Sequence, residues 1–252
     1  MMKLPSIISY LDLLLKTDSI HDYPQALNGL QLENNGFIER IAMAVDASAA
    51  VIQKAVEEKN TLLLVHHGLF WSGLRPLRDS FYRKIKLAID AQLAIYSSHL
   101  PLDLHPLFGN NILLAQELDL FNLQPAFEIE GQFVGYIGEC IPMARNEFLK
   151  KITILLGKAP NLAPGGPEII EKVLVVSGGA GNRVAEAFAY GIDTFVTGEG
   201  SHWSYQEAEE LGINLIYAGH YATETFGVKA LGKHLSEYFE LPCSFIDHPS
   251  GL

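Results

Sequence analysis

The chain has 252 residues, of which 48% are hydrophobic and 19% are charged, and this balance excludes a disordered, collagenous or coiled-coil protein. At roughly 100–200 residues per domain, the length allows one large domain or two small ones. Its 18 Lys and Arg against 29 Asp and Glu give a net charge of −11, so neither nucleic acid nor an anionic membrane surface is an expected partner. An acidic chain can still bind an anionic substrate where a metal supplies positive charge.

The N-terminal segment and the cysteines indicate an intracellular chain without a membrane span. No apolar run reaches the roughly 20 residues that a helix needs to cross a bilayer. Residues 1–16 carry Asp12 inside an apolar stretch and have no small-residue cleavage site, which is typical of an amphipathic helix rather than a secretory signal. Cys140 and Cys243 are far apart and have no metal-type spacing, so we expect no disulfide framework and a cytoplasmic location.

Apolar runs alternate with amphipathic stretches of helical length along the chain, and this alternation predicts an α/β fold. The expected strands cover residues 41–45, 61–65, 93–97 and 133–140, and the expected helices cover 48–59, 81–91, 110–118 and 147–156. We expect a turn at Pro142 and a loop over 159–167, a segment rich in proline and glycine. The two α/β halves are placed approximately at 1–125 and 126–252.

The second half of the chain resembles the first. At one constant offset, the strand at 41–45 aligns with 173–177, the helix at 51–58 with 183–190, and the strand at 62–65 with 194–197. The same offset aligns the only two tryptophans, Trp71 and Trp203. With a shorter connection, residues 94–99 match 215–220, and both segments end in histidine. The identity is low, so two generic α/β units remain an alternative, but these coincidences favour a pseudo-duplication.

Polar side chains follow the expected strands, at the place where open α/β sheets bind ligands. In the first half these residues are His66 and His67, then His99 and Asp103; in the second they are Glu199 and His202, then His220 and Glu224. Each later pair reads His-x-x-x-carboxylate. Imidazoles and carboxylates that converge from two halves make a mixed site suited to Zn, Fe, Mn or Co. A carboxylate can also bridge two cations that activate one shared water.

Each of these residues also has a plain structural interpretation. His66 and His67 could form a polar surface pair, His99 could stabilise a turn before Leu-Pro, and Glu224 could cap a helix. The recurrence at four equivalent strand ends favours the metal site over these separate explanations. His105, His234 and His248 lack such a setting and are expected to be solvated or structural.

Other catalytic motifs are weakly represented. The sequence has no G-x-S-x-G elbow, and neither cysteine has a catalytic context. The glycines of residues 177–182 lack the register of a dinucleotide-binding loop. We expect these glycines to let the backbone turn tightly near the site.

Six motifs occur together in the order of a known family. They are Asn28-Gly-Leu-Gln31, Val65-His-His-Gly68, His99-Leu-Pro-Leu-Asp103, Gly109-Asn-Asn111, Thr197-Gly-Glu199 and Gly219-His-Tyr-Ala-Thr-Glu224. Together they resemble the YbgI/NIF-three-like dinuclear metal-centre proteins, commonly named GTP cyclohydrolase I type 2 homologues. The resemblance extends over nearly the whole chain.

This resemblance implies two interleaved α/β domains, with the metal site at the strand ends between them, and a toroidal homohexamer. It implies two divalent metal ions per subunit, with ligands at His66, His67, Asp103, His220 and Glu224, the last of them bridging. His99 corresponds to a further polar residue beside the metals. The chain lacks the domain that longer members insert, and Tyr221 stands where some relatives carry another histidine.

The leading functional hypothesis is a metal-dependent hydrolase that acts on a nucleotide or related ring compound through a metal-bridging hydroxide. In the cyclohydrolase reaction, the hydroxide attacks the imidazole carbon of the purine and formate is released. Glu199, His99 or His202 could carry protons. One alternative is a non-catalytic hexameric metal-binding or regulatory assembly. Another is a metal-dependent phosphoesterase, for which Arg75, Arg78 and Arg183 could supply cationic help.

Overall fold

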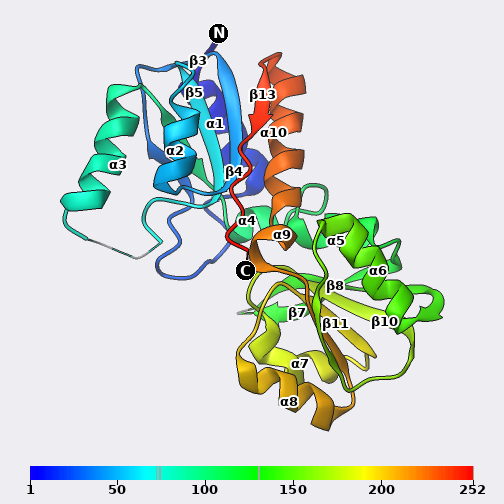
Figure 1. Cartoon of the computed structure of the whole chain (residues 1–252). Helices are drawn as coiled ribbons and strands as arrows, with labels where there is room; N and C mark the ends of the chain where they lie inside the picture. Colours follow the sequence, from blue (N-terminus) through cyan, green and yellow to red (C-terminus); the bar gives the residue numbers. More distant parts are fainter. Residues whose placement is uncertain (72, 74, 130, 252) are drawn as a thin grey trace. The chain divides into compact units, whose positions relative to one another are not determined.

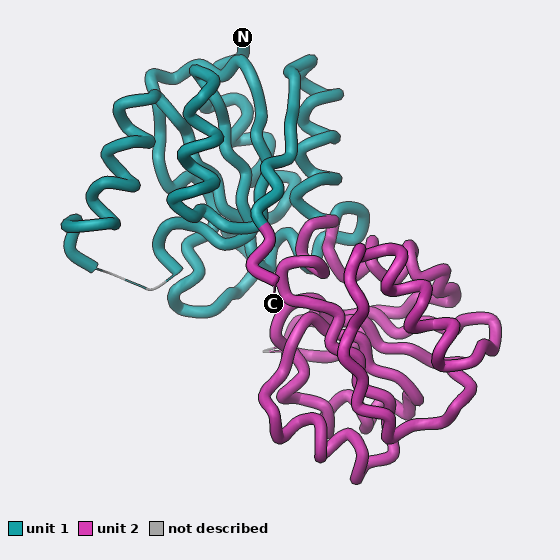
Figure 2. The backbone as a smooth tube through the Cα atoms, in the orientation of Figure 1, with its two compact units in different colours: residues 1–108, 227–248 teal, residues 109–226, 249–252 magenta. Residues whose placement is uncertain are grey.

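The computed structural model describes residues 1–252 except 72, 74, 130 and 252. The described chain forms two compact units, Met1–Phe108 with Gly227–His248, and Gly109–Phe226 with Pro249–Leu252 (Figure 2). The chain therefore leaves the first unit, builds the second and returns to the first. This division assigns residues 109–125 and 227–248 differently from the halves expected at 1–125 and 126–252.

The first unit is built on a five-stranded sheet in the order β13-β4-β5-β6-β2. Its strands are β2 (Gly29–Leu32), β4 (Arg40–Asp46), β5 (Thr61–His67), β6 (Ala94–Ser97) and β13 (Cys243–Phe245). Strands β13, β4, β5 and β6 are parallel, whereas β2 runs antiparallel to β6. A separate antiparallel pair is formed by β1 (Met2–Lys3) and β3 (Phe37–Ile38).

Helices cover both faces of this sheet (Figure 1). They are α1 (Leu4–Leu15), α2 (Ala49–Ala55), α3 (Asp79–Asp90), the short α4 (Leu100–Asp103) and α10 (Thr225–Phe239). Side chains alternate along β5, so Leu62 and Leu64 pack with α1 and α10, whereas Leu63 and Val65 pack with α2 and α3. Burial on both faces explains why the strand is continuously apolar.

The second unit contains a six-stranded sheet in the order β7-β8-β10-β11-β12-β9. Its strands are β7 (Phe121–Ile129), β8 (Gln132–Ala144), β9 (Asn161–Pro164), β10 (Ile169–Val176), β11 (Thr194–Thr197) and β12 (Asn214–Tyr217). Its helices are α5 (Asn110–Glu117), α6 (Arg145–Leu156), the 3₁₀ turn η1 (Gly181–Arg183), α7 (Val184–Phe188), α8 (His202–Leu211) and α9 (His220–Thr223). Helices α5 and α6 cover one face of the sheet, and α7 and α8 cover the other (Figure 1).

The two sheets share one strand arrangement. Three successive parallel strands, β4-β5-β6 in one unit and β10-β11-β12 in the other, are each followed by an antiparallel edge strand, β2 or β9. The prediction of an α/β fold with two interleaved, pseudo-duplicated units is therefore confirmed.

Two local predictions around the prolines were wrong. Pro142 lies inside β8, where the pairing with β10 shifts between Ile170 and Lys172. Such an irregularity accommodates a residue without an N–H group. The expected loop over 159–167 contains β9, which pairs with β12 at the edge of the six-stranded sheet. Pro164 is compatible with that position because an edge strand has one unpaired side.

Within the described residues, no helix has the length and apolar character required to span a membrane.

Candidate metal centre

His66 and His67 are placed by the end of β5, the central strand of the first unit. In a regular strand adjacent side chains point to opposite faces, yet these two rings have centroids 4.8 Å apart. The chain leaves the strand at Gly68, where a β-carbon would collide with the amide of Gln31. The same amide oxygen accepts a hydrogen bond from Leu69 N at 2.6 Å. A side chain at position 68 would therefore displace the Gln31 amide from this hydrogen bond, and glycine leaves room for it where the strand ends.

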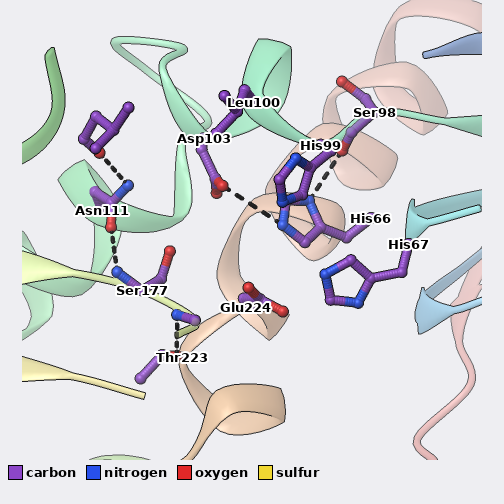
Figure 3. Close-up of polar contacts among 12 residues, drawn as sticks. His66, His67, Ser98, His99, Leu100, Asp103, Asn111, Ser177, Thr223 and Glu224 are labelled. Carbon is purple, nitrogen blue, oxygen red and sulfur yellow. Dashed lines mark hydrogen bonds and ion pairs between the residues drawn. The ribbon is translucent and has the colours of Figure 1, made fainter. Parts of the chain in front are cut away.

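His66 is fully buried and has a fixed ring orientation. Its Nδ1 lies 2.9 Å from the carbonyl oxygen of Ser98, which requires Nδ1 to be the donor in the neutral ring. The lone pair is then on Nε2, which lies 3.5 Å from Oδ2 of Asp103 (Figure 3). The turn of α4 supplies Asp103, which is itself buried.

His67 is held in the same way by Asp46, the last residue of β4. Nδ1 of His67 lies 2.8 Å from Oδ1 of Asp46. The two residues are register partners in the parallel pairing of β4 with β5. Asp46 directly follows the strand expected at 41–45, so its position at a strand end was the signal by which the sequence could have identified it.

His99 is fixed by Asp22 and Asn28. Nδ1 of His99 lies 2.8 Å from Oδ1 of Asp22, while Oδ2 accepts hydrogen bonds from Asn28 Nδ2 at 2.8 Å and from Leu100 N at 3.0 Å. Burial alone would raise the pKa of Asp22. The hydrogen bond and charge of His99, together with the hydrogen bonds from Asn28 and Leu100, outweigh burial, so the pKa of Asp22 is lowered. Asp22 lies in an irregular segment, and no sequence pattern identified it.

The three histidines of the first unit form one cluster. His66, His67 and His99 each offer a ring nitrogen, and these atoms lie within 4.8 Å of one another. This spacing is compatible with ligands of a common cation.

In the second unit, His220 and Glu224 are brought together by the short helix α9. Nε2 of His220 lies 3.1 Å from Oε1 of Glu224, and its Nδ1 lies 2.9 Å from Oε1 of Glu199 at the end of β11. Burial lowers the pKa of His220, but the hydrogen bonds and charges of Glu224 and Glu199 outweigh burial and raise the pKa to about 9. In the metal-free protein this imidazole is therefore held protonated by two carboxylates.

The glycine-rich loop after β10 lies directly against Glu224. Gly178 has a φ of 67°, and a β-carbon there would lie 2.5 Å from Oε1 of Glu224. The loop is anchored by Ser177 N, which donates to Asn111 Oδ1 at 2.6 Å, and by Gly178 N, which donates to Thr223 Oγ1 at 3.1 Å (Figure 3). As expected from the sequence, these glycines allow a tight turn beside the candidate ligands.

Four histidines of the two units share one hydrogen-bonding pattern. Nδ1 of each lies near an oxygen acceptor: Ser98 O for His66, Asp46 for His67, Asp22 for His99 and Glu199 for His220. The carbonyl acceptor of His66 fixes the tautomer of that ring with the Nε2 lone pair available, and the carboxylate acceptors orient the other three rings so that Nε2 points away from them, as is typical of metal-ligating histidines. The donor set of imidazoles and carboxylates fits Zn, Fe, Mn or Co.

Four further histidines were singled out from the sequence. His202 is the exposed first residue of α8 and lines the same cavity as Glu199. His105 stacks on the ring of Phe108, whereas His234 lies tilted against that ring and stacks on Tyr10, and both contacts are structural. His248 is exposed.

The three arginines considered as phosphate ligands have neighbours within the chain. Arg75 lies over the ring of Phe81, Arg78 lies 3.9 Å from Asp79, and Arg183 pairs with Glu186.

Comparison with known proteins places the whole chain in one family. The profile of Duf34/NIF3 (NGG1p interacting factor 3) matches residues 2–250. A protein of Deinococcus radiodurans named "GTP cyclohydrolase 1 type 2 homolog" is 41% identical, over 91% of this chain and 88% of that protein. TTHA1606 from Thermus thermophilus has a TM-score of 0.90 at 38% identity, with full coverage of both chains. The protein ybgI, described as of unknown function, has a TM-score of 0.92 at 33% identity, also with full coverage of both chains. The profile match, the sequence identity and the shared fold all lead to one conclusion: the chain belongs to the Duf34/NIF3 family.

Proposed function

We propose that this chain is a metal-dependent hydrolase that acts on a nucleotide or a related ring compound. In this proposal two divalent cations per subunit are held by His66, His67, Asp103, His220 and Glu224. The observation that carries the proposal is the orientation of the histidines, whose Nδ1 atoms all lie near oxygen acceptors. The name of the D. radiodurans relative supports a nucleotide as the substrate.

Bound cations would supply positive charge for an anionic substrate and lower the pKa of a water towards neutrality. Asp46 and Glu199 hold His67 and His220 so that Nε2 of each ring is presented. Half of the Glu199 side chain is exposed, so its carboxylate can exchange a proton with solvent or substrate. His99 is nearly buried and fixed by Asp22, which favours a positioning or ligand role over proton exchange with solvent.

The proposal includes a cytoplasmic homo-oligomer, with a toroidal hexamer as the expected form. Strand β7 is an edge of the second sheet, and β7 and β8 carry the exposed side chains of Phe121, Phe133 and Ile141. Apolar side chains on a sheet edge support self-association. Light scattering on the purified full-length chain measures the number of subunits.

The phosphoesterase alternative has less support than hydrolysis of a ring compound. Arg75 and Arg183 contact Phe81 and Glu186, so these arginines are engaged within the chain rather than reserved for phosphate. A panel of nucleotides and phosphoesters, each assayed with Mn, Fe, Zn and Co, separates the reactions. Sustained turnover of any of them contradicts the purely non-catalytic assembly.

The central test combines metal analysis with turnover. His67→Ala and Glu224→Gln, made separately, should each lose bound metal and GTP hydrolysis. The matched control is His248→Gln, which removes an exposed histidine and should retain both properties. Full GTP turnover by either ligand variant after its metal has been removed would contradict the proposal.

A further inference from the structure

A cavity of about 640 Å³ lies within the second unit, beside the residues that hold His220. Its lining includes Lys158, Glu199, His202, Tyr205, Tyr217 and Gly219. We propose that this cavity binds a nucleotide-class ligand, with a planar heteroaromatic ring against the tyrosines and an anionic group at Lys158. The proposal rests on the proposed function, because it names the site at which that substrate would be held.

The size and position of the cavity fit this class of ligand. Small-molecule sites typically measure about 300–1,000 Å³, which includes this cavity. Glu199, whose carboxylate accepts a hydrogen bond from Nδ1 of His220, is part of the lining. Gly219, which directly precedes His220, also lines the cavity. A ligand in the cavity would therefore lie next to a candidate metal ligand of the same unit.

One wall of the cavity is built around the ring of Tyr217. A β-carbon on Gly200 would lie 2.9 Å from Cε1 of this ring, and one on Gly181 would lie 3.0 Å from it, so glycine at both positions makes room for the ring. Ser204 Oγ donates to Ser201 O at 2.7 Å, and the Tyr217 hydroxyl therefore donates to Ser204 Oγ at 2.8 Å. The ring is held in place at both its edge and its hydroxyl.

A second aromatic side chain, Tyr205, lines the cavity from α8 and is 36% exposed. The lining therefore has two aromatic side chains, one of them held by its neighbours and the other accessible, and we place the flat ring of the ligand against them. Stacking on aromatic side chains tolerates any base because every base has a π face.

The charges of the lining favour a ligand with a polar ring and an anionic group. Among the described residues that line the cavity, Lys158 is the only lysine or arginine and Glu199 the only carboxylate. Glu199 follows β11, whereas Lys158 precedes β9, on the other side of β12. Lys158 Nζ donates to Gly251 O at 2.6 Å, and an ammonium group has two further N–H donors to offer a phosphate.

Binding to the metal-free, full-length protein tests the assignment. Calorimetric titrations with GTP, guanosine and inorganic triphosphate separate the contribution of the ring from that of the anion. Tyr205→Leu should weaken both GTP and guanosine about tenfold. Its control is Trp203→Leu, which removes a half-exposed aromatic of the same helix that is not part of the described lining.

Lys158→Ala should weaken GTP by about tenfold and leave guanosine unchanged, because only GTP carries the anionic group. Its control is Lys150→Ala, at an exposed position on α6. Three results would each overturn the assignment. They are no binding of GTP or guanosine, equal losses of affinity in Tyr205→Leu and Trp203→Leu, and binding of triphosphate as tight as that of GTP. The titration needs neither metal nor turnover. It therefore tests ligand binding in the cavity even if the protein proves not to be a hydrolase.

Discussion

At the scale of single residues, oxygen acceptors determine which nitrogen of each histidine faces the candidate site. Asp46 and Glu199 accept from Nδ1 of His67 and His220, and a backbone carbonyl does so for His66. These acceptors act through the imidazoles, so their removal should weaken cation binding while the ligands themselves stay in place. Outer carboxylates of this kind typically contribute about 10–100-fold to metal affinity.

Asp46→Ala tests this contribution. We expect the affinity of the protein for Zn or Mn, measured by competition with a chelator, to fall about 10–100-fold, because His67 loses the acceptor that orients its ring. The control is Asp90→Ala, which removes an exposed aspartate that pairs with Lys86. Unchanged affinity in Asp46→Ala, or equal losses in both variants, would show that Asp46 does not orient a ligand.

At the scale of elements, strand ends and the loops that follow them position the candidate ligands. Strands β5 and β11 were predicted well because each is a short apolar run with parallel neighbours on both sides. Strand β9 was missed because its sequence is rich in turn-forming residues, and only its pairing with β12 makes it a strand. For the loop after β10, the sequence predicted a tight turn from its glycines. It did not predict that Gly178 approaches Glu224 closely, because that contact joins two distant segments.

The role of this loop is tested by Gly178→Ala and its matched control Gly191→Ala. The two glycines have φ values of 67° and 65°, so alanine should cost about 1–2 kcal/mol of unfolding free energy at either position. Only the β-carbon at position 178 meets Glu224, and the flexible end of that side chain must move away. We expect about a tenfold loss of metal affinity in Gly178→Ala alone. Similar metal affinities in the two variants would contradict this account.

At the scale of the whole molecule, the chain builds the same parallel three-strand arrangement twice, and each unit has its own hydrophobic core. The first unit contributes His66, His67 and Asp103 to the proposed centre, and the second contributes His220 and Glu224. If the two sets hold the same cations, metal binding stabilises both units together. A ligand present at 100 times its Kd adds about 2.7 kcal/mol of stability.

Thermal unfolding with and without chelator tests this shared occupancy. Chelation should lower the Tm of the wild type, while His67→Gln and Glu224→Gln should each show no further drop on chelation. If each variant kept part of the metal-dependent increase in Tm, the two units would be binding cations separately. His248→Gln serves as the control and should respond to chelation as the wild type does.

The amino-acid sequence by itself determined the α/β class, the repeated strand pattern and the candidate ligands, because periodicity and motif spacing are local properties of the chain. It also indicated the family through six short motifs that occur in order. Tertiary structure alone decided the partners of those ligands. Asp22 and Asn28 reach His99 from a distant irregular segment, and Asp46 reaches His67 through the register of two strands. Such contacts depend on how separate segments pack, which no local pattern encodes.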